Sequence, residues 1–72
     1  MNPTAEQRAI LAALPNGQRT AFWSRYHHGT NLSEIARSMH LTMEQVEALL
    51  ADARSTVGCT PEEARTSAWG GL

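Results

Sequence analysis

The chain has 72 residues, of which 42% are apolar and 18% are charged, and its formal net charge is −1. This composition predicts one small globular domain and excludes a disordered chain, and its apolar runs are too short to span a membrane. The lone cysteine, Cys59, excludes an internal disulfide, and the first residues lack the pattern of a signal peptide, so we expect a cytoplasmic protein.

Helical patterns follow one another along the chain, and no stretch alternates as a strand does. Thr4 and Gln7 predict a capping box at the start of a first helix. The apolar residues expected on its buried face are Ala9, Ile10, Ala13 and Leu14. The Pro-Asn-Gly sequence at residues 15–17 is expected to end this helix.

A second helix is expected from about residue 18 to about residue 28. Phe22 and Tyr26 are four residues apart and therefore face one way, which is typical of core positions. Trp23 lies one step off that face and is a candidate for an interface with a partner. Gly29 suits a left-handed cap at the end of the helix.

Residues 32–51 predict a helix-turn-helix, with an ordinary helical hairpin as the alternative. Asn31 and Glu34 form a capping pair, and a helical stripe of apolar residues follows. Ala36 lies where the two helices cross, and its small side chain lets them approach closely. Leu41 follows the turn, and Thr42 caps a second helix that continues to Gly58. The apolar residues of the two helices are Leu32, Ile35, Ala36, Met39, Val46, Leu49, Leu50, Ala53 and Val57.

The last residues, 59–72, form a tail in which Thr60 caps, Pro61 begins and Glu63 supports a short helix. Ala64, Ala68 and Trp69 are expected to pack this tail on the body, and residues 70–72 are expected to fray. The predicted fold is an all-α bundle of four to five helices, with a helix-turn-helix domain over residues 1–58 and a tail over residues 59–72.

Residues 14–57 resemble region 4 of the bacterial sigma-70 family, because several weak motifs occur here in the family's order and spacing. They are Leu14-Pro15, Gln18-Arg19, Phe22, Arg25-Tyr26, Gly29, Leu32, Glu34-Ile35-Ala36, Met39, Leu41-Thr42, Val46, Leu49 and Ala53-Arg54. The resemblance implies a helix-turn-helix that reads the −35 promoter element while nearby surfaces hold the flap of RNA polymerase. The chain has no room for region 2, so we do not expect a complete sigma factor.

The recognition helix implied by this resemblance runs from Thr42 to about Val57, and its first turns would enter the major groove. We predict that Glu44 accepts a hydrogen bond from cytosine and that Gln45 pairs with adenine. The residues predicted to contact DNA are Thr42, Met43, Glu44, Gln45, Glu47, Arg37 and Arg54. Two departures from the family occur: His40 stands where a turn glycine is usual, and Glu47 and Asp52 replace the usual basic residues.

The charge is divided unevenly along the chain, which has no lysine. Residues 1–41 carry four arginines against two glutamates, and residues 42–72 carry two arginines against five acidic residues. Because phosphate neutralisation supplies much of the affinity for DNA, this balance disfavours strong binding without help. We expect help from RNA polymerase, a sigma factor or a second copy of the chain. The residues predicted to contact such a partner are Arg19, Trp23 and Arg25.

Two further interpretations remain open for the function. The fold could be a protein-interaction module that regulates polymerase or a sigma factor without touching DNA, or a domain excised from a longer protein. His27, His28, His40 and Cys59 lack the paired spacing of a zinc site, and no metal or other cofactor is predicted. Ser24, His28 and Asp52 do not converge into a catalytic arrangement, so no enzyme activity is expected.

Overall fold

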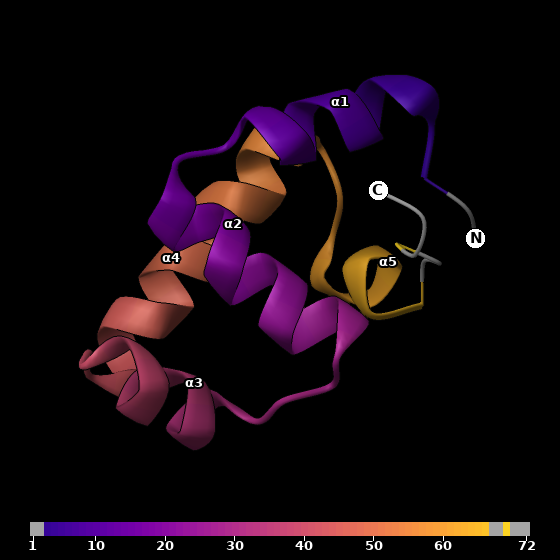
Figure 1. The fold of residues 1–72 in the computed structure, drawn as a ribbon. Coiled ribbons are helices and arrows are strands. Elements are labelled where there is room, and N and C mark those ends of the chain that lie inside the picture. Colours follow the sequence, from indigo (N-terminus) through magenta and orange to yellow (C-terminus); the bar gives the residue numbers. More distant parts are fainter. Residues whose placement is uncertain (1–2, 67–68, 70–72) are drawn as a thin grey trace.

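Helices make up nearly all the regular structure in the computed structural model, which describes residues 3–66 and Trp69. They are α1 (Ala5–Ala13), α2 (Asn16–Phe22), the π-helical turn η1 (Trp23–His27), α3 (Leu32–Met39), α4 (Met43–Val57) and α5 (Pro61–Thr66). Within these residues there is no strand, and no helix has both the length and the hydropathy to cross a membrane. The predicted all-α bundle is confirmed, and Figure 1 shows α2 lying in front of α4.

Three helices begin with the same exchange of hydrogen bonds at a threonine. The threonine hydroxyl accepts the backbone N–H of the third residue on, whose side-chain oxygen accepts the threonine N–H, at 2.9 to 3.1 Å. The pairs are Thr4 with Gln7, Thr42 with Gln45, and Thr60 with Glu63. Each cap contributes about 1 kcal/mol. Short helices are marginal by themselves, so these caps fix where α1, α4 and α5 start.

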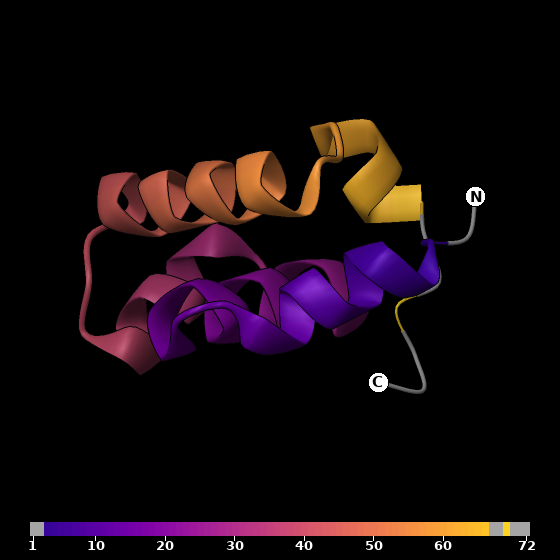
Figure 2. The ribbon, with the colours of Figure 1, turned by 90° about the horizontal axis from the view of Figure 1, so that it is seen from above.

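The core lies along one side of α4, where Val46, Leu50, Ala53 and Val57 are buried at helical spacing, as predicted. Figure 2 shows α4 and α5 on one side of the molecule and α1 and α2 on the other. The apolar side of α4 is therefore buried against the helices that precede it in the chain, and its other side is exposed to solvent.

An aromatic cluster joins the end of the chain to this core. Phe22 is fully buried, and its ring centroid lies 4.8 Å from that of Tyr26 and 4.9 Å from that of Trp69, both edge-to-face. The Trp69 indole N–H donates to the Ala64 carbonyl at 2.7 Å. Trp69 and Ala64 are both buried, so the tail packs on the body as expected. Ala68 and residues 70–72 lie outside the described residues.

Two predictions for the first helices were wrong. Ala9 and Ala13 are exposed, because α1 turns Leu11 toward the core instead, whereas Leu14 is buried as predicted. The second helix starts at residue 16 rather than near residue 18, since Pro15 stands just ahead of the first turn, where its missing N–H costs nothing. Gly17 then lies inside α2, where an added methyl group would touch Leu49.

The second helix ends near residue 28, as predicted, but its last turn widens into the π-helical η1. The N–H of His28 donates to the Trp23 carbonyl at 3.2 Å, and the N–H of Thr30 donates to the Ser24 carbonyl at 3.0 Å. The wider turn stacks the His27 ring on Trp23 with centroids 4.1 Å apart. Gly29 then adopts a φ of 69°, the left-handed conformation expected of it.

The turn between α3 and α4 has the geometry of a helix C-cap. His40 has φ 58° and ψ 41°, and the Leu41 N–H donates to the Ala36 carbonyl at 2.8 Å. This is the left-handed turn that glycine usually makes, and it sends the chain into α4 after two residues. Ala36 is buried where α3 packs on α4, as its small side chain predicts. The turn therefore sets the direction in which α4 leaves α3.

Candidate nucleic-acid interface

The first turns of α4 form an exposed polar surface, which we call the α4 outer face. Thr42, Met43, Glu44, Gln45 and Glu47 are all exposed, while Val46 between them is fully buried. Among the large apolar side chains of the described residues, Met43 is the one that is exposed, with 49% of its surface open to solvent. The five residues predicted here to contact DNA are thus brought together and open to solvent.

The helical period extends the α4 outer face beyond the predicted residues. At 100° per residue, the direction opposite the buried Val46 and Ala53 is occupied by Glu44, Ala48 and Ser55, with Ala51 beside them. Ala48, Ala51 and Ser55 are exposed, and they were not predicted to contact DNA because only the first turns of the helix and two arginines were expected at the groove. The buried stripe could have revealed them, since the opposite side of a helix follows from it. Their small size allows a surface to approach the α4 backbone closely.

Two of the predicted base-reading residues already use their side-chain oxygens in the α4 cap. The Thr42 hydroxyl accepts the Gln45 N–H at 3.1 Å, and the Gln45 Oε1 accepts the Thr42 N–H at 2.9 Å. A bidentate pair with adenine needs both the oxygen and the nitrogen of an amide side chain. Gln45 therefore offers its Nε2 alone unless the cap opens. The carboxylate of Glu44 forms no hydrogen bond with another described residue.

The electrostatics of the α4 outer face are acidic. Glu44, Glu47 and Asp52 are exposed, and Arg54 is the basic residue of α4. Arg54 is half-buried, and its guanidinium donates to the Tyr26 hydroxyl at 2.7 Å, which ties α4 to η1. Arg37 lies on α3 and is exposed. Of the two arginines predicted to contact DNA, Arg37 is therefore open to solvent and Arg54 is held between two helices.

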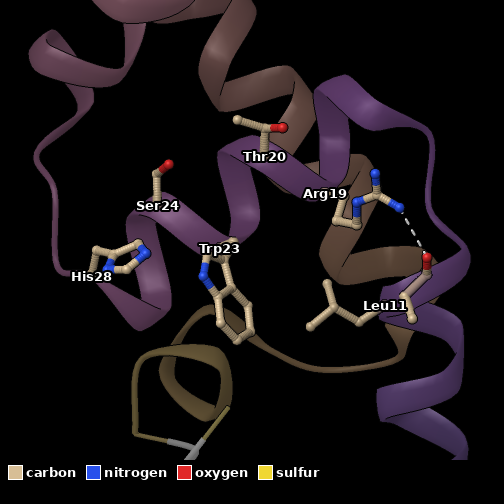
Figure 3. Close-up of a pocket in the computed structure, with 7 residues that line it drawn as sticks. Leu11, Arg19, Thr20, Trp23, Ser24 and His28 are labelled. Carbon is tan, nitrogen blue, oxygen red and sulfur yellow. Dashed lines mark hydrogen bonds between the residues drawn. The ribbon is translucent and has the colours of Figure 1, made fainter. Parts of the chain in front are cut away.

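The residues predicted to contact a protein partner do not all lie together. Arg19 and Trp23 line one depression of about 440 Å³ between α1 and the α2–η1 helix, which Figure 3 shows with Leu11 on its far wall. Arg19 donates to the Ala12 carbonyl at 3.1 Å and also to the Asn16 side chain. We call this depression the α1–α2 groove. Arg25 lies outside it.

Arg25 lies on η1 and lines two other depressions. One is shared with Arg54 and Glu47 of α4, and the other with Arg65 of α5. The Arg25 guanidinium donates to the Thr30 carbonyl at 3.3 Å, which helps to hold the loop before α3. Its predicted role at a partner surface is thus separated from that of Arg19 and Trp23.

The residues considered for metal binding do not converge. Within the described residues, no group of three or more His, Cys, Asp or Glu side chains is arranged to hold an ion. Burial raises the pKa of the Cys59 thiol, Glu63 adds to this rise, and Arg54 partly offsets it. A raised pKa keeps the thiol protonated at neutral pH and so disfavours metal binding and nucleophilic attack.

Comparison with known families gives one match. A family model described as sigma-70, region 4 matches residues 6–57, which run from α1 to the end of α4. The match stops before α5 and Trp69. No curated protein and no solved structure matches the chain.

Proposed function

The chain belongs to the sigma-70 region 4 family, and on that premise we propose a transcription regulator that docks α4 in promoter-type DNA with the help of a protein partner. Domains of this family are helix-turn-helix domains that bind DNA and take part in transcription. The observation that carries the proposal is the α4 outer face. Its side chains are exposed at the start of a helix whose opposite side is fully buried, as groove docking requires.

The need for a partner follows from charge. Phosphate contacts supply most of the affinity of DNA-binding proteins, and the α4 outer face carries Glu44, Glu47 and Asp52. The α1–α2 groove offers a partner an exposed Arg19 and a half-buried Trp23 beside the apolar Leu11. RNA polymerase or a sigma factor is the partner we propose, because domains of this family contact polymerase. A second copy of the chain is the alternative source of affinity.

Reversal of one charge on α4 tests groove docking. Glu47→Lys removes a repulsion from phosphate and adds an attraction, so we expect tighter binding to duplex DNA and a salt dependence steeper by about one unit. Fluorescence anisotropy at low and moderate salt measures both quantities. Glu62→Lys makes the same charge change on α5, away from α4, and is the matched control. Equal effects of the two substitutions would mean that net charge, and not docking of α4, governs binding.

A second function is favoured by the same acidic surface. Glu44, Glu47 and Asp52 give the exposed side of α4 a negative charge, as the phosphates give a nucleic acid. In this second function, α4 would bind a basic protein surface and regulate transcription without contacting DNA. Purified RNA polymerase and a random duplex distinguish the two functions. Polymerase binding that Glu47→Lys weakens, with no duplex binding at low salt, favours the protein-binding function. Duplex binding that Glu47→Lys strengthens favours DNA docking.

A further inference from the structure

A depression between η1 and α5 is lined by basic side chains from two separate parts of the sequence. Arg25, His27 and His28 come from η1 and its cap, and Arg65 comes from α5. We call it the η1–α5 pocket. Its volume is about 460 Å³, and none of the described residues that line it is acidic. A pocket of this size takes a small molecule, and its lining selects an anion.

The two guanidinium groups are available to a ligand. Arg65 is exposed and forms no hydrogen bond or ion pair with another described residue. Arg25 is half-buried, and one of its N–H groups donates to the Thr30 carbonyl at 3.3 Å. This bond fixes the direction of the guanidinium and leaves its other N–H groups able to donate to a ligand. Planar guanidinium groups match the oxygens of phosphate, and a partly buried charge is less screened by water.

Two histidine rings complete the lining of the pocket. The His27 ring is held by its stack on Trp23, and the His28 ring meets it edge-on with centroids 4.8 Å apart. Both rings are exposed, and each imidazole offers a ring N–H that can donate to an anion. The histidines therefore add hydrogen-bond donors beside the two guanidinium groups.

We propose that the η1–α5 pocket binds the phosphate group of a small molecule, either free phosphate or a phosphorylated metabolite. The pocket differs from the DNA surface proposed above. In Figures 1 and 2, α5 lies at the opposite end of the molecule from the start of α4. Arg65 also lies outside the residues matched by the family model. The proposal therefore stands whether or not α4 binds DNA.

Other charged groups lie near the pocket. Tyr26 lines the pocket, and its hydroxyl accepts a hydrogen bond from Arg54 of α4, which adds a further positive charge nearby. On α5, Glu62 and Glu63 precede Arg65, and the Glu63 carboxylate accepts the Thr60 N–H. Neither of these two carboxylates lines the pocket.

Amide NMR of the whole chain, titrated with sodium sulfate at constant ionic strength, tests this proposal. Sulfate is a stable mimic of a phosphate dianion. We expect saturable shifts at residues 25–29 and at Arg65, which line the pocket. Inorganic phosphate should shift the same amides. No saturable shift at these residues overturns the proposal.

Two arginine variants sharpen the test. Arg65→Ala removes an exposed donor pair and should weaken sulfate binding about tenfold. Arg37→Ala removes an exposed arginine of α3 outside the pocket and should leave sulfate binding unchanged. Equal weakening by both variants indicates general charge attraction and overturns the proposal. A loss of duplex DNA affinity in Arg65→Ala as large as its loss of sulfate affinity assigns the pocket to the DNA backbone, and this also overturns it.

Discussion

His40 carries the clearest local strain among the described residues. It is the one described residue other than glycine with a positive φ, and this conformation costs an L-amino acid roughly 1–2 kcal/mol. His40→Gly should therefore raise the free energy of unfolding by about 1 kcal/mol, as measured by urea denaturation. Gly58 has φ 84°, so Gly58→Ala should lower it by a similar amount. A loss of stability in His40→Gly would contradict this reading of the turn.

Single residues also show where sequence reasoning succeeds and where it stops. The capping threonines were predictable, because a cap depends on residues within one turn of it. The hydrogen bond between Arg54 and Tyr26 was not, since its partners are 28 positions apart and meet only when α4 packs on η1. Arg54 consequently looked like a free DNA contact. The cap that pairs Thr42 with Gln45 is equally local, and it leaves only the Gln45 Nε2 for adenine.

Among the helices, α5 is joined to the core by the buried Trp69 as well as by its own Ala64. Trp69 is 2% exposed, contacts Phe22 edge-to-face and donates to the Ala64 carbonyl. Replacing a buried tryptophan with alanine typically costs about 3–5 kcal/mol, which is a large part of the stability of a small domain. Trp69→Ala should therefore unfold at much lower urea concentration, as followed by circular dichroism.

The matched control for this prediction is Trp23→Ala, because Trp23 is only half-buried. It should cost clearly less than Trp69→Ala, since truncation costs scale with the packing that is lost. An equal or smaller cost for Trp69→Ala would mean that α5 and Trp69 contribute little to the core.

The helices also show which parts of the fold tertiary packing decides. The buried residues of α4 could be predicted from their helical spacing, because a long helix with a clear apolar side can pack on the core with that side only. The short α1 carries apolar residues on several sides, so its alanines and leucines compete for the core. Packing against α4 selects Leu11, which buries more apolar surface than Ala9 or Ala13. The π-helical turn adds one residue within a single helix, and no local pattern in residues 23–27 marks it.

The molecule as a whole separates its charges onto different surfaces. The α4 outer face is acidic, whereas Arg19, Arg37 and Arg65 lie exposed on three other helices. Docking of α4 in a groove therefore relies on close approach along Ala48 and Ala51 and on attraction supplied from elsewhere. The sequence predicted the acidic balance and the helix-turn-helix, but the distribution of arginines over the surface depends on how the helices pack.

An amide NMR titration of the whole chain with duplex DNA at low salt tests the proposed docking of α4. The account predicts shifts concentrated at residues 42–48, with further shifts at Ala51 and Ser55 on the same outer face. These shifts should shrink as salt rises, because phosphate attraction weakens. An unchanged spectrum at low salt, or shifts confined to the α1–α2 groove around Arg19 and Trp23, would contradict it.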